Sequence, residues 1–161
     1  TEPLDETFWT AALGPTEAAD LLVERISAAD ERIAMVASTQ TPQFDIDEVG
    51  QRIVSEFENA LDRGVSVSIL MRPELVETLP RAVGRRYRSE LQPREEFAVR
   101  TSQNVTGTFE LIDHVEVCIE VPHPLRAGET FAVIDFKDPE FATTVEAEFG
   151  QRWENATELK L

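Results

Sequence analysis

The stretch TGTFELIDHVEVCIEV, residues 106–121, decides the fold class of this 161-residue chain. Apolar residues alternate with polar ones on both sides of Asp113 and His114. This alternation predicts two strands, 108–112 and 115–121, joined by a tight turn at these two residues. Such a hairpin adds antiparallel pairing to the sheet that the rest of the chain forms.

The residues before this hairpin predict alternating helices and strands. A first helix is expected from about Thr16 to Ala29, and a second begins at an Asp45 cap, with Glu48 in the capping-box position, and ends at Gly64. Short apolar runs predict strands at 32–38, 65–71 and 97–101, and a third helix within 74–91 that is broken near Pro80. Helices between successive strands imply right-handed parallel crossovers.

The residues after the hairpin predict one more strand, 131–136, and a closing helix. Asp138 and Pro139 have the residue types of a helix start. The apolar stripe of this helix consists of Phe141, Val145, Phe149 and Trp153. We therefore predict an α/β sandwich, with a mixed β-sheet flanked by helices, in a single domain spanning 1–161. Residues 1–13 are expected to be a lead-in or linker.

The charge balance limits the partners of the domain. Asp and Glu number 31 against 15 Lys and Arg, which gives a formal net charge of −16. Such a field repels phosphate backbones, so direct binding of DNA or RNA is not expected. Lysine occurs only at positions 137 and 160. This composition is typical of the cytoplasm of a salt-loving organism, where salt screens the self-repulsion; an acidic mesophilic domain is the alternative.

Motifs for cofactors, metals and export are absent from the sequence. There is no Gly-rich phosphate loop, no nucleophile elbow and no cluster of Cys and His that would hold zinc. The single cysteine, Cys118, is expected to be a structural strand residue in a reducing compartment. No secretory signal and no apolar run long enough to cross a membrane is visible, so we expect a cytoplasmic protein. The chain begins at Thr1 without Met, and we expect it to be a piece of a longer protein.

Arginines concentrate in one short segment of this acidic chain. They are Arg81, Arg85, Arg86, Arg88 and Arg94. One interpretation is an exposed helix face that pairs with neighbouring acids. The other is an anion-binding surface or a charged interface to another chain or domain.

Several segments together resemble the phospholipase D-like fold. They are the hairpin described above, the run Asp138-Pro-Glu-Phe-Ala, the spacing Phe149-x-x-x-Trp153-x-x-Ala156, and the helix–strand pattern of residues 13–71. More narrowly, the chain is similar to the effector-sensing domain of archaeal TrmB-type transcription regulators. In those proteins this fold follows an N-terminal winged helix, and the acidic composition suits a haloarchaeal member.

The catalytic motif of the phospholipase D-like family is degenerate in this chain. That motif is His-x-Lys followed after four residues by Asp, and the corresponding residues here are Thr106, Thr108 and Asp113. A threonine hydroxyl does not shuttle protons near neutral pH, and it lacks the fixed positive charge of lysine. We therefore expect no phospholipase or nuclease activity. Strand alternation would place Thr106 and Thr108 on one face, in a pocket suited to a neutral polar ligand such as a sugar.

The resemblance implies a non-catalytic sensor and dimerisation domain of a transcription regulator. It implies a homodimer, a small-molecule effector and contact with DNA only through a separate N-terminal winged-helix domain, with no cofactor, metal or membrane. A purely structural dimerisation domain and an enzyme with an unrecognised hydrolytic site are the alternatives. Because open α/β sheets bind ligands outside strand ends, the candidate ligand-binding residues are Ser38, Thr39, Gln40, Arg72, Thr106, Thr108, Asp113, Glu120 and His123.

Overall fold

A computed structural model describes residues 8–38, 46–127 and 130–159 of the chain. Eight strands form one mixed sheet in the order β1-β7-β6-β5-β2-β3-β4-β8. The strands are β1 (Phe8–Leu13), β2 (Arg32–Ala37), β3 (Ser66–Met71), β4 (Phe97–Thr101), β5 (Phe109–Ile112), β6 (Glu116–Pro122), β7 (Thr130–Lys137) and β8 (Thr157–Glu158). The helices are α1 (Pro15–Ser27), α2 (Ile46–Asp62), α3 (Pro73–Glu77), α4 (Arg81–Arg86), a π-helical segment η1 (Tyr87–Leu91) and α5 (Pro139–Glu154).

The strand pairing confirms the predicted α/β fold with a mixed sheet. Strands β2, β3 and β4 are parallel neighbours, whereas β5, β6, β7 and β1 pair antiparallel. The predicted hairpin is present as β5 and β6. Its turn places Asp113 at φ 53° and His114 at φ 66°, in the left-handed region that a short polar side chain such as Asp tolerates better than most.

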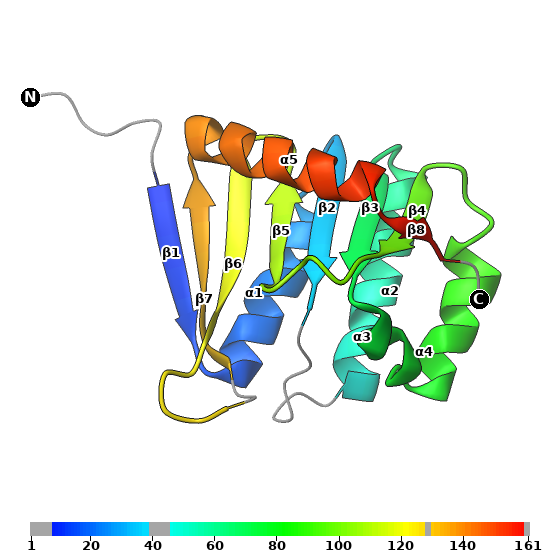
Figure 1. Ribbon diagram of the computed structural model, residues 1–161, viewed down its shortest axis with the longest axis horizontal. Coiled ribbons are helices and arrows are strands. Elements are labelled where there is room, and N and C mark those ends of the chain that lie inside the picture. The colour runs from blue at the N-terminus through cyan, green and yellow to red at the C-terminus, as the bar shows by residue number, and fades with distance from the viewer. Residues whose placement is uncertain (1–7, 39–45, 128–129, 160–161) are drawn as a thin grey trace, which may run out of the picture.

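Helices cover both faces of the sheet (Figure 1). On one face α1, α2, α4 and η1 pack over a core that includes Ile26, Phe57 and Tyr87. On the other face α5 crosses in front of the strands, and its Phe149 packs against Leu111 from β5. Alternate residues of β2 and β3 therefore belong to two separate cores, one on each face.

Local sequence signals explain where several elements begin and end. The side chain of Asp138 accepts a hydrogen bond of 3.1 Å from the backbone N–H of Phe141 and so caps α5. Gly64, at φ +90°, follows the end of α2. Pro80 separates α3 from α4, as predicted for the broken third helix. The Asp45 cap lies outside the described residues, as does the Glu48 side chain.

Two expectations about the ends of the chain are wrong. Residues 8–13 are not a lead-in, because they form the edge strand β1, which pairs with residues 132–137 of β7. Phe141 is 38% exposed and packs edge-on against Phe136, so Ala142 takes its place in the buried stripe of α5. In the part of the chain that is described, no helix has the length and apolar character needed to span a membrane.

Candidate functional site

Two of the candidate ligand-binding residues meet where β2 ends and β5 begins. The backbone N–H of Ser38 donates to the Thr108 hydroxyl oxygen at 3.2 Å. The Thr108 carbonyl in turn accepts from the backbone N–H of Glu120 at 2.9 Å, and the Glu120 carboxylate accepts from the Thr130 hydroxyl at 2.8 Å. The Ser38 hydroxyl is buried there without a hydrogen-bond partner. Ser38, Thr108 and Glu120 are therefore neighbours, but none of the three lines the pocket that contains Thr106.

Thr106 lies beside this group but in a different environment. Strand β5 begins only at Phe109, so strand alternation does not apply to Thr106 and Thr108. Instead, Thr106 is exposed and lines a pocket of about 300 Å³ between α5 and the segment 104–109. The floor of the pocket is apolar, and its polar groups come from Asn104, Thr106, Thr144, Glu148 and Arg152.

Arg72 holds the segment that leads to Thr106. Its Nη1 atom donates to the carbonyls of Gln103 at 3.3 Å and Val105 at 3.2 Å. Its Nη2 atom forms an ion pair of 2.8 Å with Glu74. The Arg72 side chain therefore positions this wall of the pocket by binding its backbone carbonyls. The charge of Arg72 is already paired with Glu74.

His123 has a structural role in the loop after β6. Its Nδ1 atom accepts from the backbone N–H groups of Leu125 at 3.0 Å and Arg126 at 3.1 Å, and its ring packs edge-on against Phe131. Thr39 and Gln40, the remaining candidates after β2, lie outside the described residues.

Asp113 does not belong with the other candidates. It follows β5 at the end opposite to Thr108, about 16 Å away along the strand at roughly 3.3 Å per residue. Its carboxylate accepts from the backbone N–H groups of Asp30 at 2.9 Å, Glu31 at 2.7 Å and Arg32 at 3.0 Å. Partial burial raises the pKa of Asp113, but these three donors outweigh it and hold the pKa below its usual value. The one residue that matches the family motif therefore secures the loop between α1 and β2.

The arginine segment divides between paired and exposed residues. Arg86 forms ion pairs with Glu58 of α2 at 2.6 Å and Glu90 of η1 at 2.8 Å. The pair with Glu58, together with hydrogen bonds to Gln51 and Ser55, ties α4 to α2. Arg94 pairs with Asp62 at 2.9 Å. The other three, which make no ion pair with the described residues, are exposed: Arg81, Arg85 and Arg88.

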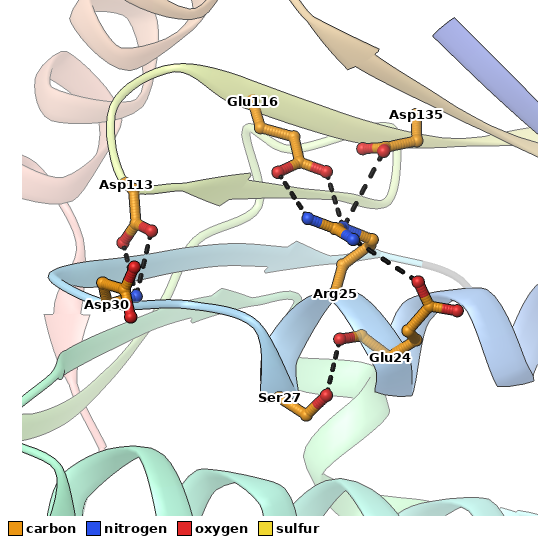
Figure 2. Close-up of polar contacts among 7 residues, drawn as sticks. All are labelled: Glu24, Arg25, Ser27, Asp30, Asp113, Glu116 and Asp135. Atoms are coloured by element: carbon orange, nitrogen blue, oxygen red, sulfur yellow. Dashed lines mark hydrogen bonds and ion pairs between the residues drawn. The ribbon is translucent and has the colours of Figure 1, made fainter.

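A cluster of charged residues that was not predicted from the sequence is buried beneath α1 (Figure 2). Arg25 of α1 faces Glu116 of β6, with Nε 2.7 Å and Nη2 3.0 Å from the two carboxylate oxygens. Its Nε also lies 3.8 Å from Asp135 of β7. Glu110 of β5 is fully buried near this group, and neither of its carboxylate oxygens has a hydrogen-bond partner. One arginine thus contacts two buried acids, and a third buried acid lies nearby.

Burial changes the protonation of this cluster. Desolvation, followed by the nearby Asp135 and Glu116, raises the pKa of Glu110 well above its usual value. Desolvation and a hydrogen bond with Glu116 raise the pKa of Asp135 to about 7. Burial likewise raises the pKa of Cys118, which keeps it a neutral core residue. In the sequence, the sign of this buried cluster is a set of acidic residues at inward-facing positions of otherwise apolar strands.

The metal-ligating residue types of the described chain are dispersed. Within 8–38, 46–127 and 130–159, no group of three or more His, Cys, Asp or Glu side chains is arranged to hold a metal ion. The two histidines are bonded elsewhere, His123 within its loop and His114 to Glu146 at 2.8 Å. The arrangement around Thr106 and Thr108 offers hydroxyl, amide and charged groups for binding a polar molecule.

Solved structures with the same fold include two bacterial phospholipase D-like proteins and an archaeal protein. The phospholipase D family member Nuc from Salmonella typhimurium is 19% identical with a TM-score of 0.73, covering 97% of this chain and all of that chain. NucT from Helicobacter pylori is 16% identical with a TM-score of 0.68, covering 96% of this chain and all of that one. TrmBL2, an archaeal chromatin protein, is 18% identical with a TM-score of 0.68; the match covers 94% of this chain and 54% of that one.

These likenesses establish the fold as phospholipase D-like. At 16–19% identity they carry no further conclusion about activity. No curated protein matches the chain at the sequence level. A family model does match it, and it spans residues 3–159. The chain therefore belongs to the family described as "Domain of unknown function (DUF7436)".

Proposed function

We propose that this chain is a non-catalytic ligand-sensing and dimerisation domain of a transcription regulator from a salt-rich cytoplasm. Its effector is a small polar molecule such as a sugar. DNA contact comes through a separate N-terminal winged-helix domain. The observation that carries the proposal is the pocket of about 300 Å³ that contains Thr106 and sets several polar groups above an apolar floor.

The lining of this pocket supports a neutral polar ligand. The Thr106 hydroxyl and the amide of Asn104 offer donors and acceptors above an apolar floor that includes Phe149. The Thr144 hydroxyl donates to the Glu140 carbonyl at 3.3 Å and offers its oxygen as an acceptor. Arg152 is already engaged, since it donates to the Asn104 carbonyl at 3.2 Å and pairs with Glu148 at 2.8 Å. A pocket with few convergent polar groups over apolar side chains suits a sugar, whose hydroxyls and C–H faces need both.

The chemistry at the motif positions supports binding without catalysis. Thr106 is exposed in the pocket, and the Thr108 hydroxyl is engaged by the Ser38 backbone. Neither side chain exchanges protons at neutral pH, and no histidine lines the pocket. The likeness to TrmBL2 supports the assignment as a regulator. The matched region makes up 54% of the TrmBL2 chain. The remainder of such a protein has room for a DNA-binding domain.

Removing single hydroxyls from the pocket is expected to weaken sugar binding. Thr106→Val and Thr144→Val keep the side-chain shape but delete the hydroxyl, and each should raise Kd by about 2- to 10-fold, which corresponds to about 0.5–1.5 kcal/mol for one hydrogen bond. Calorimetric titration of the purified chain with glucose, galactose and maltose measures this change.

Thr143→Val is the matched control for Thr144→Val. Thr143 is the neighbouring residue on α5, is exposed and does not line the pocket, so its substitution should leave Kd unchanged. Equal losses for Thr143→Val and Thr144→Val would place the sugar elsewhere. If none of the three sugars binds, a sugar effector is excluded. Metal-free cleavage of a phosphodiester by the purified chain would exclude a non-catalytic domain.

An exposed apolar patch supports the proposed homodimer. Leu13, Leu125 and Phe131 are 61%, 88% and 45% exposed. They lie at one end of β1 and β7, where the Gly14 N–H donates to the Phe131 carbonyl at 3.1 Å and His123 links the Leu125 loop to the Phe131 ring. A second copy is the occupant of this patch, because an apolar patch on a chain of net charge −16 can meet its own equivalent in a two-fold dimer.

Salt is expected to strengthen this dimer. Two copies, each with a net charge of −16, repel one another at 0.1 M KCl, where the Debye length is about 10 Å, but at molar salt it is about 3 Å. We expect the dimer dissociation constant to fall by about tenfold or more between 0.1 and 2 M KCl. Sedimentation equilibrium measures it.

Phe131→Asp places a charge in the patch and should leave a monomer in 2 M KCl. Phe141→Asp is the matched control, because Phe141 is also exposed but lies on α5. A chain that is monomeric at every salt concentration would exclude the homodimer. A dimer that is tightest in low salt would exclude adaptation to a salt-rich cytoplasm.

A further inference from the structure

A second cavity lies on the opposite face of the sheet from the Thr106 pocket. It measures about 160 Å³, is partly open to the surface, and is lined mainly by β2, β3 and β4 together with α2, α4 and η1. Its lining consists entirely of aliphatic, aromatic and methionine residues and a glycine, and it includes Met35, Phe57, Ile69 and Met71. Val36 and Leu70 alternate with these strand residues and line the Thr106 pocket. The same two strands therefore separate a wholly apolar cavity from a pocket that carries polar groups above an apolar floor.

The helical wall of this cavity departs from regular helix geometry. Segment η1 is a π-helix, and its two buried residues, Tyr87 and Leu91, both line the cavity. The widened turn of a π-helix is uncommon and frequently marks a functional site. Beside it, Gly50 of α2 lets Val83 of α4 approach so closely that an added Cβ would lie 2.9 Å from a Val83 methyl. This close approach brings α4 against α2 while the space beneath them stays open.

An apolar space of this size does not suit water. A buried water molecule needs two to four polar partners, and the lining surface of the cavity offers none. A cavity of roughly 150 Å³ lined by Leu, Ile and Phe in another protein stays dry and binds benzene or xenon. The volume here, about 160 Å³, is of the same size.

We propose that this cavity is a binding site for a small apolar molecule, either a single ring or a short hydrocarbon chain. Apolar surface on both sides of the ligand supplies the affinity, and the volume of the cavity limits the size of the ligand. An adjoining pocket of about 350 Å³ shares Tyr87, Phe97, Val99 and Leu159 with the cavity and adds polar groups from β4 and β8. This arrangement gives the ligand a route of entry beside β4 and the edge strand β8.

Methionine methyl NMR tests this proposal on the unaltered chain. The sequence contains two methionines, and both Met35 and Met71 line the cavity. Toluene is the probe for a ring, hexanoate is the probe for a chain, and glucose is the polar control. We expect saturable shifts of both methyl signals with toluene, hexanoate or both, and no shift with glucose. No shift with either apolar probe would overturn the proposal, and so would equal shifts with glucose.

Filling the cavity gives a second, independent readout. Ala37→Leu adds three carbon atoms from the sheet side, whereas Ala28→Leu makes the same change at an exposed position at the end of α1. At a toluene concentration one hundred times Kd, the unfolding equilibrium constant of the unaltered chain should fall about a hundredfold. Ala28→Leu should keep this effect and Ala37→Leu should lose it. An undiminished effect in Ala37→Leu would overturn the proposal.

The two pockets can be tested separately. A sugar in the Thr106 pocket contacts Val36 and Leu70, but neither methionine lines that pocket. Sugar binding without methyl shifts therefore supports the proposed function alone, and toluene shifts without sugar binding support the apolar site alone.

Discussion

Replacing Arg25 by Met should lower the free energy of unfolding by about 3–5 kcal/mol at neutral pH, the usual effect of removing one partner of a buried ion pair. Methionine fills a similar volume but leaves Glu116 and Asp135 without the guanidinium that lies between them. Urea unfolding measures the change. Arg94→Met is the matched control, because Arg94 pairs with the exposed Asp62, and this substitution should cost less than about 1 kcal/mol.

The pH dependence gives this result a distinctive signature. The folded-state pKa of Asp135 is about 7, above its ordinary value of 3.8, so the folded protein binds the proton more tightly than the unfolded chain. The contribution of Asp135 to stability is therefore fully present below pH 4 and is lost as the pH rises to about 7; Glu110 acts in the same direction. Without Arg25 this loss should be steeper, so Arg25→Met should be most harmful at high pH. A penalty that is small or independent of pH would contradict the arrangement of the cluster.

Replacing Asp113 by Ala should destabilise the protein by about 2–4 kcal/mol at pH 7. The substitution leaves three backbone N–H groups in the loop between α1 and β2 without their acceptor, and it places Ala at φ 53°. Asp113→Asn is the matched variant. Asparagine tolerates the same backbone conformation and keeps one acceptor oxygen, so Asp113→Asn should lose less stability than Asp113→Ala.

Measuring stability at low pH distinguishes the structural role of Asp113 from a role in ligand binding. The folded pKa of Asp113 is lowered, so its contribution is present above its unfolded pKa and disappears as the pH falls through the folded value. The difference between Asp113→Ala and the unaltered chain should therefore shrink below about pH 4. An Asp113→Ala variant that is fully stable but does not bind sugar would instead place Asp113 in the ligand site.

The hairpin and the crossovers could be predicted because their signals are local. Alternation in β5 and β6 and the residue types at the Asp113–His114 turn are visible within 16 residues. Strand β1 could not be found in this way. Its partner β7 lies more than 100 residues further along the chain, and the register of that pairing, with Phe8 opposite Lys137, is set by tertiary contacts.

The candidate site was predicted only in part for the same reason. Ser38 and Thr108 lie together where β2 ends and β5 begins, whereas Asp113 lies a whole strand away from Thr108, as the predicted strand 108–112 with its turn at Asp113 already implies. In the buried cluster the decisive fact is the register that aligns Glu110, Cys118 and Asp135 across three neighbouring strands. In a chain with 31 acidic residues, no single one of them indicates burial by its type.

The two terminal strands close opposite edges of the sheet, β1 beside β7 and β8 beside β4 (Figure 1). A shortened protein that starts at Gly14, on the assumption that the first thirteen residues are only a tether, would leave the eight-residue strand β7 with a bare row of backbone donors and acceptors. Bare strands of that length invite pairing between molecules. Such a fragment would therefore be prone to aggregation even with every side chain of both pockets intact.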